Sequence, residues 1–139
     1  MIVHTAEIHI QTKGHGHAVD ITSDVQKIIT ESGLINGIAV VFVPGATAGL
    51  TTIEFESGAV KDLQLAIDRM APETISYHHN LKWHDGNGHS HVRAALIGPD
   101  ITIPVKGNRL ILGTWQQILL LDFDNKSRHR CVVTQLLGE

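Results

Sequence analysis

Cysteine, charge and long apolar runs are scarce in this sequence, and each shortage excludes a class of protein. Cys131 is the single cysteine, so no disulfide can form within the chain, which suits a reducing compartment. No apolar run approaches the ~20 residues of a membrane-spanning helix, and no basic segment leads into a long apolar stretch as in a secretion signal. The formal net charge of −3 lacks the basic excess typical of nucleic-acid binding. We therefore expect a cytoplasmic protein whose partners include neither a membrane nor a nucleic acid.

Aromatic residues are also few, at 4%, yet the apolar fraction of 42% and the charged fraction of 18% are those of a folded globular chain. A length of 139 residues matches one domain and is enough to bury a substantial core. No internal repeat, low-complexity tract or linker divides the chain. We expect residues 1–139 to form a single domain.

Apolar periodicity predicts two main helices among many strands. Apolar residues recur at helical spacing over residues 23–32, which Gly33 follows, and over residues 58–70, which Pro72 closes. Strands are expected at residues 2–10, 18–21, 38–43, 46–56, 94–97, 101–105, 109–112, 117–123 and 130–137. Because most connections are hairpin-like, the fold class is α+β with a mostly antiparallel β-sheet or sandwich. Open sheet edges favour pairing between subunits, so a homo-oligomer is expected.

The stretch Tyr77–Ala95 concentrates the residues best suited to chemistry. It holds five of the ten histidines, namely His78, His79, His84, His89 and His91. Asp85 lies among them as an oxygen ligand or hydrogen-bond partner, while Gly86 and Gly88 loosen the backbone. Functional sites are commonly built on such loops, so we expect the site here.

A metal site is the first interpretation of this stretch. If a strand begins at His89, then His89, His91 and Arg93 share one face, with about 6–7 Å between alternate residues. Two imidazoles at that spacing can ligate a divalent ion, and His79 or His84 can fold over as a third ligand. Three protein ligands with one open position describe a catalytic site, with zinc expected first and magnesium second.

A second interpretation needs no metal. Arg93, the histidines and the glycine-rich backbone can bind a phosphate, with one histidine as general acid. In either case Asp85 can serve as a ligand or can fix a histidine tautomer. A third interpretation is structural, with His89 and His91 making ordinary hydrogen bonds at the start of a strand. The residues alone leave all three open.

Two further segments carry candidate substrate-binding residues. Trp115 stands between Gly-Thr and two glutamines in a chain with few aromatic residues, so it can stack on a flat ligand ring while Gln116 hydrogen-bonds the ligand. A Trp that covers the core or a subunit interface is the alternative. Glu54 falls on the polar side of the expected strand 46–56, where it either reaches the histidine pocket or is exposed to solvent.

Several motifs taken together resemble the YjbQ-type family. They are His79, Asp85, Ser90-His91-Val92-Arg93, Gly98, Pro104-Val105, Gly107, Gly113-Thr114-Trp115-Gln116 and the closing Gly138-Glu139. The resemblance covers essentially the whole chain and is specific as an ensemble, although no single motif is. Members of the family are described as secondary thiamine-phosphate synthases and are otherwise largely uncharacterised.

The resemblance implies an α+β fold assembled as a homotrimer, with pockets near the subunit boundaries. It also implies a weak thiamine-phosphate synthase activity, which joins a pyrimidine methyl diphosphate to a thiazole phosphate. The family positions that match are His79, Asp85, His91, Arg93, Trp115 and Gln116. Many relatives have a His-Thr pair where this chain has Pro44-Gly45-Ala46-Thr47, so a role of that histidine does not transfer.

Composition, chemistry and resemblance together predict a transferase-like enzyme that acts on a small phosphorylated substrate. The expected catalytic residues are His91, His79, Asp85 and Arg93. The expected substrate-binding residues are Trp115, Gln116 and Glu54, and the expected metal ligands are His79, His91 and His89. The alternative is a non-catalytic homotrimer that binds a metal or a small ligand.

Overall fold

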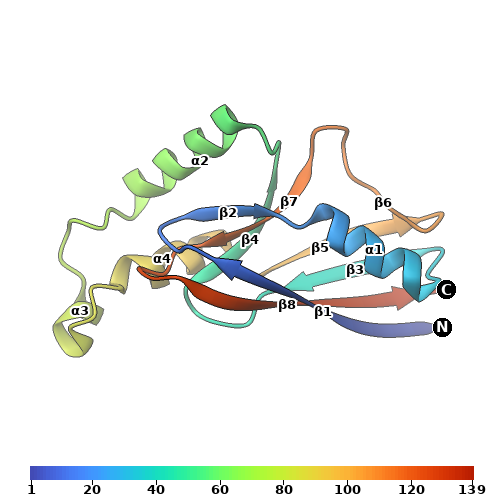
Figure 1. Ribbon diagram of the computed structural model, residues 1–139, viewed down its shortest axis with the longest axis horizontal. Helices are drawn as coiled ribbons and strands as arrows, with labels where there is room; N and C mark the ends of the chain where they lie inside the picture. Colours follow the sequence, from blue (N-terminus) through green and yellow to red (C-terminus); the bar gives the residue numbers. More distant parts are fainter.

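Eight strands and four helices make up the computed structural model, which describes residues 1–139 (Figure 1). In chain order they are β1 (Ile2–Thr12), β2 (His17–Asp20), α1 (Thr22–Ser32), β3 (Gly37–Phe42), β4 (Ala48–Ile53), α2 (Ser57–Met70), α3 (His78–Trp83), α4 (Gly88–Ile97), β5 (Asp100–Lys106), β6 (Arg109–Leu110), β7 (Gln117–Asp122) and β8 (Arg128–Gly138). None of the four helices combines the length and the apolar character needed to cross a membrane.

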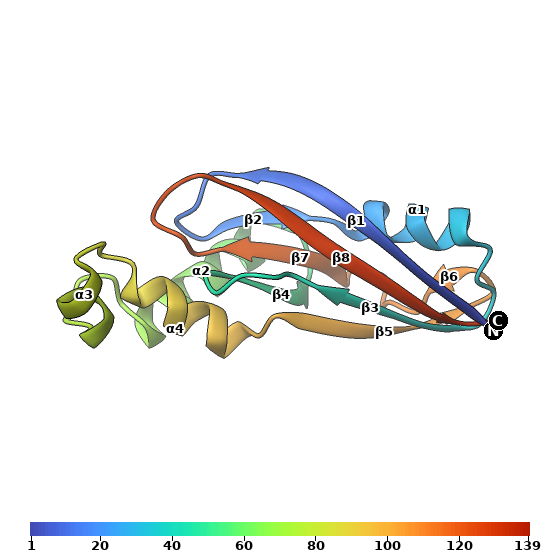
Figure 2. The same cartoon turned by 90° about the horizontal axis from the view of Figure 1, so that it is seen from below.

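Two antiparallel sheets carry the fold. One has the strand order β1-β8-β3-β5-β6 and the other has the order β2-β7-β4. Every pair of neighbouring strands is antiparallel. The two longest strands, β1 and β8, pair from end to end and run diagonally across the three-stranded sheet (Figure 2). The α+β class and the mostly antiparallel sheet are therefore confirmed.

The core fills the space between the sheets and under α1. Alternate residues of β1, β3, β5 and β8 meet Leu50 and Leu120 of the smaller sheet, and Val25 and Ile29 of α1 close the cluster. Strand β7 is buried on both faces, because Leu121 and the adjoining Phe123 pack instead with residues of α2 and α4. A continuous apolar run is typical of such a doubly covered strand.

The two helices expected from apolar periodicity are confirmed with nearly the expected bounds. Helix α1 ends at Gly33, whose φ of 76° is the left-handed conformation that glycine adopts readily. Helix α2 begins after Glu56, whose side chain accepts hydrogen bonds from the backbone N–H groups of Gly58 and Ala59.

The strand expected from His89 to Ile97 is wrong, because this segment is helix α4. The buried residues of α4 include His89, Ser90, Arg93 and Ala94, a spacing of one helical face. The preceding segment, taken as a loop, contains the short helix α3. Two helices beyond the expected pair therefore form where the sequence pattern indicated loop and sheet.

Candidate functional site

Helix α3 lies at one end of the molecule, and α4 leads from it back to the sheets, where it packs against β4 (Figure 1). His84, with a φ of 54°, ends α3, and the chain turns through Gly86 at a φ of 64°. The backbone N–H of Gly88 then donates to Oδ1 of Asn80 at 2.9 Å, which ties the start of α4 to α3. The two helices are thereby held against each other, and each presents one histidine to the space between them.

His79 of α3, Asp85 of the turn and His91 of α4 form the candidate site. The imidazole rings of His79 and His91 have their centroids 4.3 Å apart, and Nδ1 of His79 lies 3.4 Å from Oδ1 of Asp85. That nitrogen is buried and makes no hydrogen bond. Three of the expected catalytic residues are thus brought together by elements that the sequence pattern did not predict.

A cavity of about 260 Å³ adjoins His91. Its wall is apolar and consists of small residues and one proline, namely Gly45, Ala46, Ala48, Ala94, Ala95 and Pro99, together with His91. Gly45 and Ala46 belong to the loop between β3 and β4. The absence of large side chains in this loop leaves room for a ligand group beside the His91 imidazole.

Arg130 lies behind the Gly45 wall of this cavity. A β-carbon placed on Gly45 would lie 3.1 Å from Nη1 of Arg130. The hydrogen bonds of Arg130 run from Nε and Nη2 to Asp122 and Thr47, and Nη1 makes none. Arg130 is buried and does not itself line the cavity. Arg130 was not among the residues expected from the sequence.

Arg93 and His89 point away from His91. Successive residues of an α-helix are about 100° apart, so the expectation that all three share one face is wrong for α4. The guanidinium of Arg93 is buried, forms an ion pair with Asp68 at 3.0 Å and donates to the Ala71 carbonyl at 2.9 Å. Its expected contact with a phosphate stays a prediction, and the structure gives this cation other partners.

His89 is a core residue, 1% exposed, and the structure does not bring it to His79 and His91. Its Nε2 lies 3.9 Å from a carboxylate oxygen of Glu73, and its Nδ1 has no hydrogen-bond partner. Burial lowers the pKa of the His89 imidazole, and the Glu73 carboxylate offsets part of that effect. His89 is therefore a buried residue of α4 outside the cluster, and its Nδ1 lacks the ordinary hydrogen bond that the structural interpretation expects.

The β7–β8 turn contributes a buried charge network that sequence analysis missed. Asp122 is fully buried, and both its oxygens accept hydrogen bonds from Arg130, at 2.6 and 2.8 Å. Asp124, equally buried, accepts from Thr47 at 2.9 Å and from Arg128 at 3.0 Å. Burial opposes the ionisation of both aspartates, but these hydrogen bonds outweigh it and lower the pKa of each carboxyl.

This network continues into the candidate site. The Ser90 hydroxyl at the start of α4 donates to the backbone carbonyl of Phe123, between the two buried aspartates. The side-chain amide of Asn125 donates to the backbone carbonyl of Asp85 at 2.7 Å. Two aspartates followed by Lys126, Arg128 and Arg130 around this turn were the available signal, but charges at a turn are usually solvated. The turn therefore positions the segment that carries Asp85 and His91.

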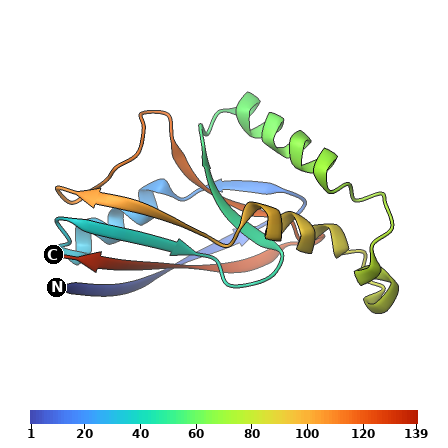
Figure 3. The same ribbon diagram turned by 180° about the vertical axis from the view of Figure 1, so that it is seen from behind.

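Trp115, Gln116 and Glu54 lie elsewhere in the chain. They occupy the far ends of β4 and β7, roughly 17 Å along the strands from the ends near α4. Gln116 donates to the Thr52 hydroxyl at 3.0 Å, and Trp115 is 71% exposed in the loop between β6 and β7. Figure 3 shows this loop well apart from α3 and α4. Within one chain, the expected substrate-binding residues do not meet the histidines.

His79, Asp85 and His91 offer the imidazole nitrogens and carboxylate oxygens that zinc accepts as ligands. The buried Nδ1 of His79, with no hydrogen-bond partner and facing the Asp85 carboxylate, fits a ligand atom. The ligand atoms of the three residues do not all lie within 4.8 Å of one another, so closing such a site requires the side chains to turn. This donor set fits a divalent ion, and His89 lies outside it.

The fold and the site define a class of small α+β proteins with two antiparallel sheets and a histidine cluster on the helix pair α3 and α4. The model of the YjbQ-like UPF0047 family matches residues 6–139, and the chain belongs to this family. A UPF0047 protein of Methanothermobacter thermautotrophicus is 35% identical over 134 residues, which cover 96% of this chain and 92% of that protein.

Solved structures agree with this assignment. A YbjQ-like protein of unknown function from Sulfolobus solfataricus matches with a TM-score of 0.94 and 34% identity, covering 99% of each chain. A YjbQ/UPF0047 protein from Clostridium acetobutylicum matches with a TM-score of 0.87 and 34% identity, covering 95% of this chain and 99% of that one. The family resemblance found in the sequence is confirmed.

Proposed function

We propose that this chain is an enzyme that transfers a group between small phosphorylated substrates at the cluster of His79, Asp85 and His91. Thiamine-phosphate formation is the reaction that the family resemblance implies. One observation carries the proposal: two imidazoles and a carboxylate converge beside an apolar cavity of about 260 Å³. A concave apolar wall with a few convergent polar groups is the usual form of a small-molecule site.

The chemistry of that reaction matches these groups. The bond between the pyrimidine methylene carbon and the diphosphate oxygen breaks, and the same carbon forms a bond to the thiazole nitrogen. Diphosphate leaves with the bonding electron pair, so negative charge develops on its oxygen. A protonated His91 can donate a proton to that oxygen, while His79 and its Asp85 partner hold a second proton nearby.

Neutralising the phosphate charge requires a cation. Nη1 of Arg130 lies close behind Gly45, which lines the cavity together with His91, whereas Arg93 is paired with Asp68 on the other side of α4. We therefore assign the phosphate contact to Arg130. A divalent ion held by His79, Asp85 and His91 would replace the protons of these imidazoles, because a ligating histidine is unprotonated, and would itself stabilise the charge of the leaving diphosphate.

A steady-state assay with the two thiamine precursors tests the proposal. Replacing His91 with alanine should lower the rate of thiamine-phosphate formation by about 10²- to 10⁴-fold, the usual contribution of a general acid. His78→Ala is the matched control, because His78 is an exposed histidine of the same helix pair outside the cluster. Equal rates for wild type and His91→Ala would refute the assignment, and binding of both precursors without turnover would establish the non-catalytic alternative.

The homotrimer forms part of the same proposal. The loop that carries Trp115 also exposes Ile111, at 71% and 54% respectively, and such apolar exposure suits burial against another subunit. In that arrangement Trp115, Gln116 and Glu54 of one copy complete the histidine site of the next.

Co-assembly of two inactive variants tests the shared site. If His91 and Trp115 act from different subunits, an equal mixture of His91→Ala and Trp115→Ala chains restores about a quarter of the sites, because each site draws its two residues independently. In parallel, the mass of the intact assembly of the purified protein gives the number of its subunits. No recovery in mixed assemblies would contradict the shared site and leave the single-chain cluster to be judged by the His91→Ala assay.

A further inference from the structure

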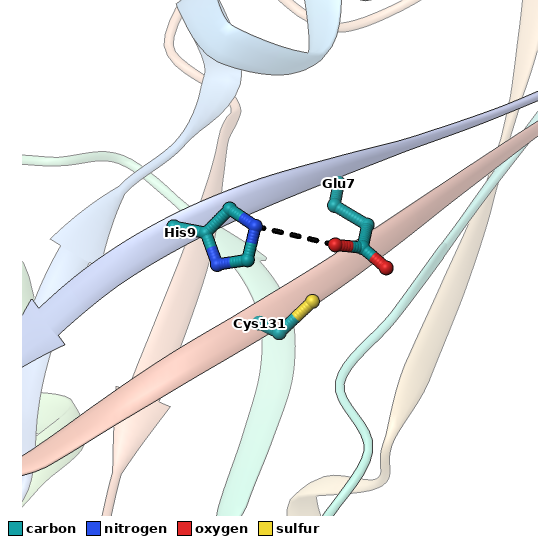
Figure 4. A group of neighbouring side chains, drawn as sticks. All are labelled: Glu7, His9 and Cys131. Atoms are coloured by element: carbon teal, nitrogen blue, oxygen red, sulfur yellow. Dashed lines mark ion pairs between the residues drawn. The ribbon is translucent and has the colours of Figure 1, made fainter.

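The outer face of the β1–β8 pair carries a second cluster of metal-ligating side chains. In the antiparallel register His9 lies opposite Cys131, and Glu7 lies two residues along β1 on the same face. The intervening residues Ile8 and Val132 are buried on the opposite face, in the core. Strand pairing therefore brings a carboxylate, an imidazole and the only thiol of the chain to one surface (Figure 4).

The three ligand atoms are already close. Nε2 of His9 lies 3.2 Å from Oε2 of Glu7, and these two atoms and Sγ of Cys131 all lie within 4.8 Å of one another. In a tetrahedral zinc site with bonds of 2.0–2.1 Å, two N/O ligand atoms are about 3.3 Å apart. The His9–Glu7 separation thus matches one edge of such a site, and the thiol lies within a side-chain rotation of the next corner.

A second imidazole orients the first. Nδ1 of His9 lies 3.1 Å from Nε2 of His129, and Nδ1 of His129 lies 2.8 Å from the side-chain amide of Gln11. When Nε2 of His9 binds a metal, its Nδ1–H donates to His129, whose own Nδ1–H donates to the amide oxygen of Gln11 after that amide rotates. A hydrogen bond from the remote nitrogen of a ligating histidine is a regular feature of metal sites.

We infer that Glu7, His9 and Cys131 form a second site, for a borderline-soft divalent transition metal of the zinc type. A thiolate and an imidazole together favour zinc over magnesium or calcium, which prefer oxygen ligands. On binding, the thiol proton passes to solvent and a metal–sulfur bond forms. Three protein ligands leave the fourth position open to water. The site shares no residue with the cluster of His79, Asp85 and His91, so the two inferences stand separately.

Cobalt(II) titration under reducing conditions tests the site directly. A thiolate-to-cobalt charge-transfer band in the near ultraviolet can arise only from Cys131, because the chain has no other cysteine. We expect the band to saturate at one ion per chain. Zinc should displace cobalt and remove the band, because a thiolate ligand favours zinc, whereas excess magnesium, which prefers oxygen ligands, should leave the band unchanged.

Variants assign the remaining ligands. Cys131→Ser should abolish the band, and His9→Ala and Glu7→Gln should each weaken cobalt binding by about 10²-fold or more. The matched control is His4→Ala, since His4 is an exposed histidine of β1 on the opposite face. The double variant His79→Ala/His91→Ala should also keep the band.

Three results would overturn the inference. They are no band in the wild-type protein, saturation at half an ion per chain, and an unchanged band in both His9→Ala and Glu7→Gln. Because His9 and Glu7 are exposed, their variants keep the test decisive even if Cys131→Ser disturbs the fold.

Discussion

Replacing Arg130 with methionine should destabilise the protein strongly, because it leaves the buried Asp122 carboxylate without its cation. Arg130 donates two hydrogen bonds to Asp122, at 2.6 and 2.8 Å, and a third to Thr47 at 2.6 Å. Removing one partner of a buried ion pair typically costs about 3–5 kcal/mol. We expect a loss of this size in the free energy of unfolding at pH 7, measured by urea denaturation with unchanged m-value.

Arg128→Met provides the matched control. Arg128 pairs with the neighbouring Asp124 at 3.0 Å, but its side chain is 41% exposed. A partly exposed pair contributes about 1 kcal/mol or less. The two substitutions remove the same charge beside equally buried aspartates, so the difference between them reflects the deeper burial of Arg130 and its additional hydrogen bonds.

The cost of Arg130→Met should also shrink in acid. In the wild type the pKa of Asp122 is lowered, so its contribution to stability is present above the ordinary value of 3.8 and is lost as pH falls through the folded-state pKa. Without Arg130, burial raises that pKa, so protonation relieves the variant as pH falls towards 4. A loss under about 1 kcal/mol at pH 7, or an equal loss at pH 7 and pH 4, would refute this reasoning.

Three further predictions concern the fold and the site. Ser90→Ala removes the hydrogen bond to the Phe123 carbonyl and should cost about 1–3 kcal/mol of unfolding free energy, together with faster hydrogen exchange at the start of α4. Gly37→Ala places a methyl group against the Leu137 backbone and should cost about 2 kcal/mol or more in urea unfolding, whereas Gly113→Ala, with only ordinary contacts to Gln116, should be near neutral. Ala46→Leu fills the cavity beside His91 from an exposed position, so the KM for the phosphorylated precursors should rise about tenfold or more while the urea midpoint stays unchanged.

The sheets and the first two helices were predictable because their burial is apolar. Val25 and Ile29 mark the buried face of α1, and the apolar run from Ile118 to Leu121 predicts a strand. The run from Ile38 to Val43 also forms a strand, but Ile38 and Phe42 are exposed, so it is not covered on both faces as its pattern indicates. Helix α4 was missed for the opposite reason. Its buried face is made of His89, Ser90 and Arg93, each held by polar contacts with other elements, so no hydrophobic periodicity reveals it.

The same contrast holds for the site. His79, Asp85 and His91 were found because imidazoles and a carboxylate crowd one short stretch, and the helices then bring them together. Arg130 was missed because a charged residue near a turn is expected to face solvent. Its burial depends on Asp122 across the hairpin, a pairing that only the three-dimensional structure reveals.

A crystal structure with diphosphate bound would test the central claim most directly. The proposed site, at which diphosphate is the leaving group, predicts the anion in the cavity beside His91, with an oxygen at Nη1 of Arg130 and another near the His79 ring. Diphosphate bound instead on the opposite side of α4, at Arg93 with Lys61 and His15, would contradict that site.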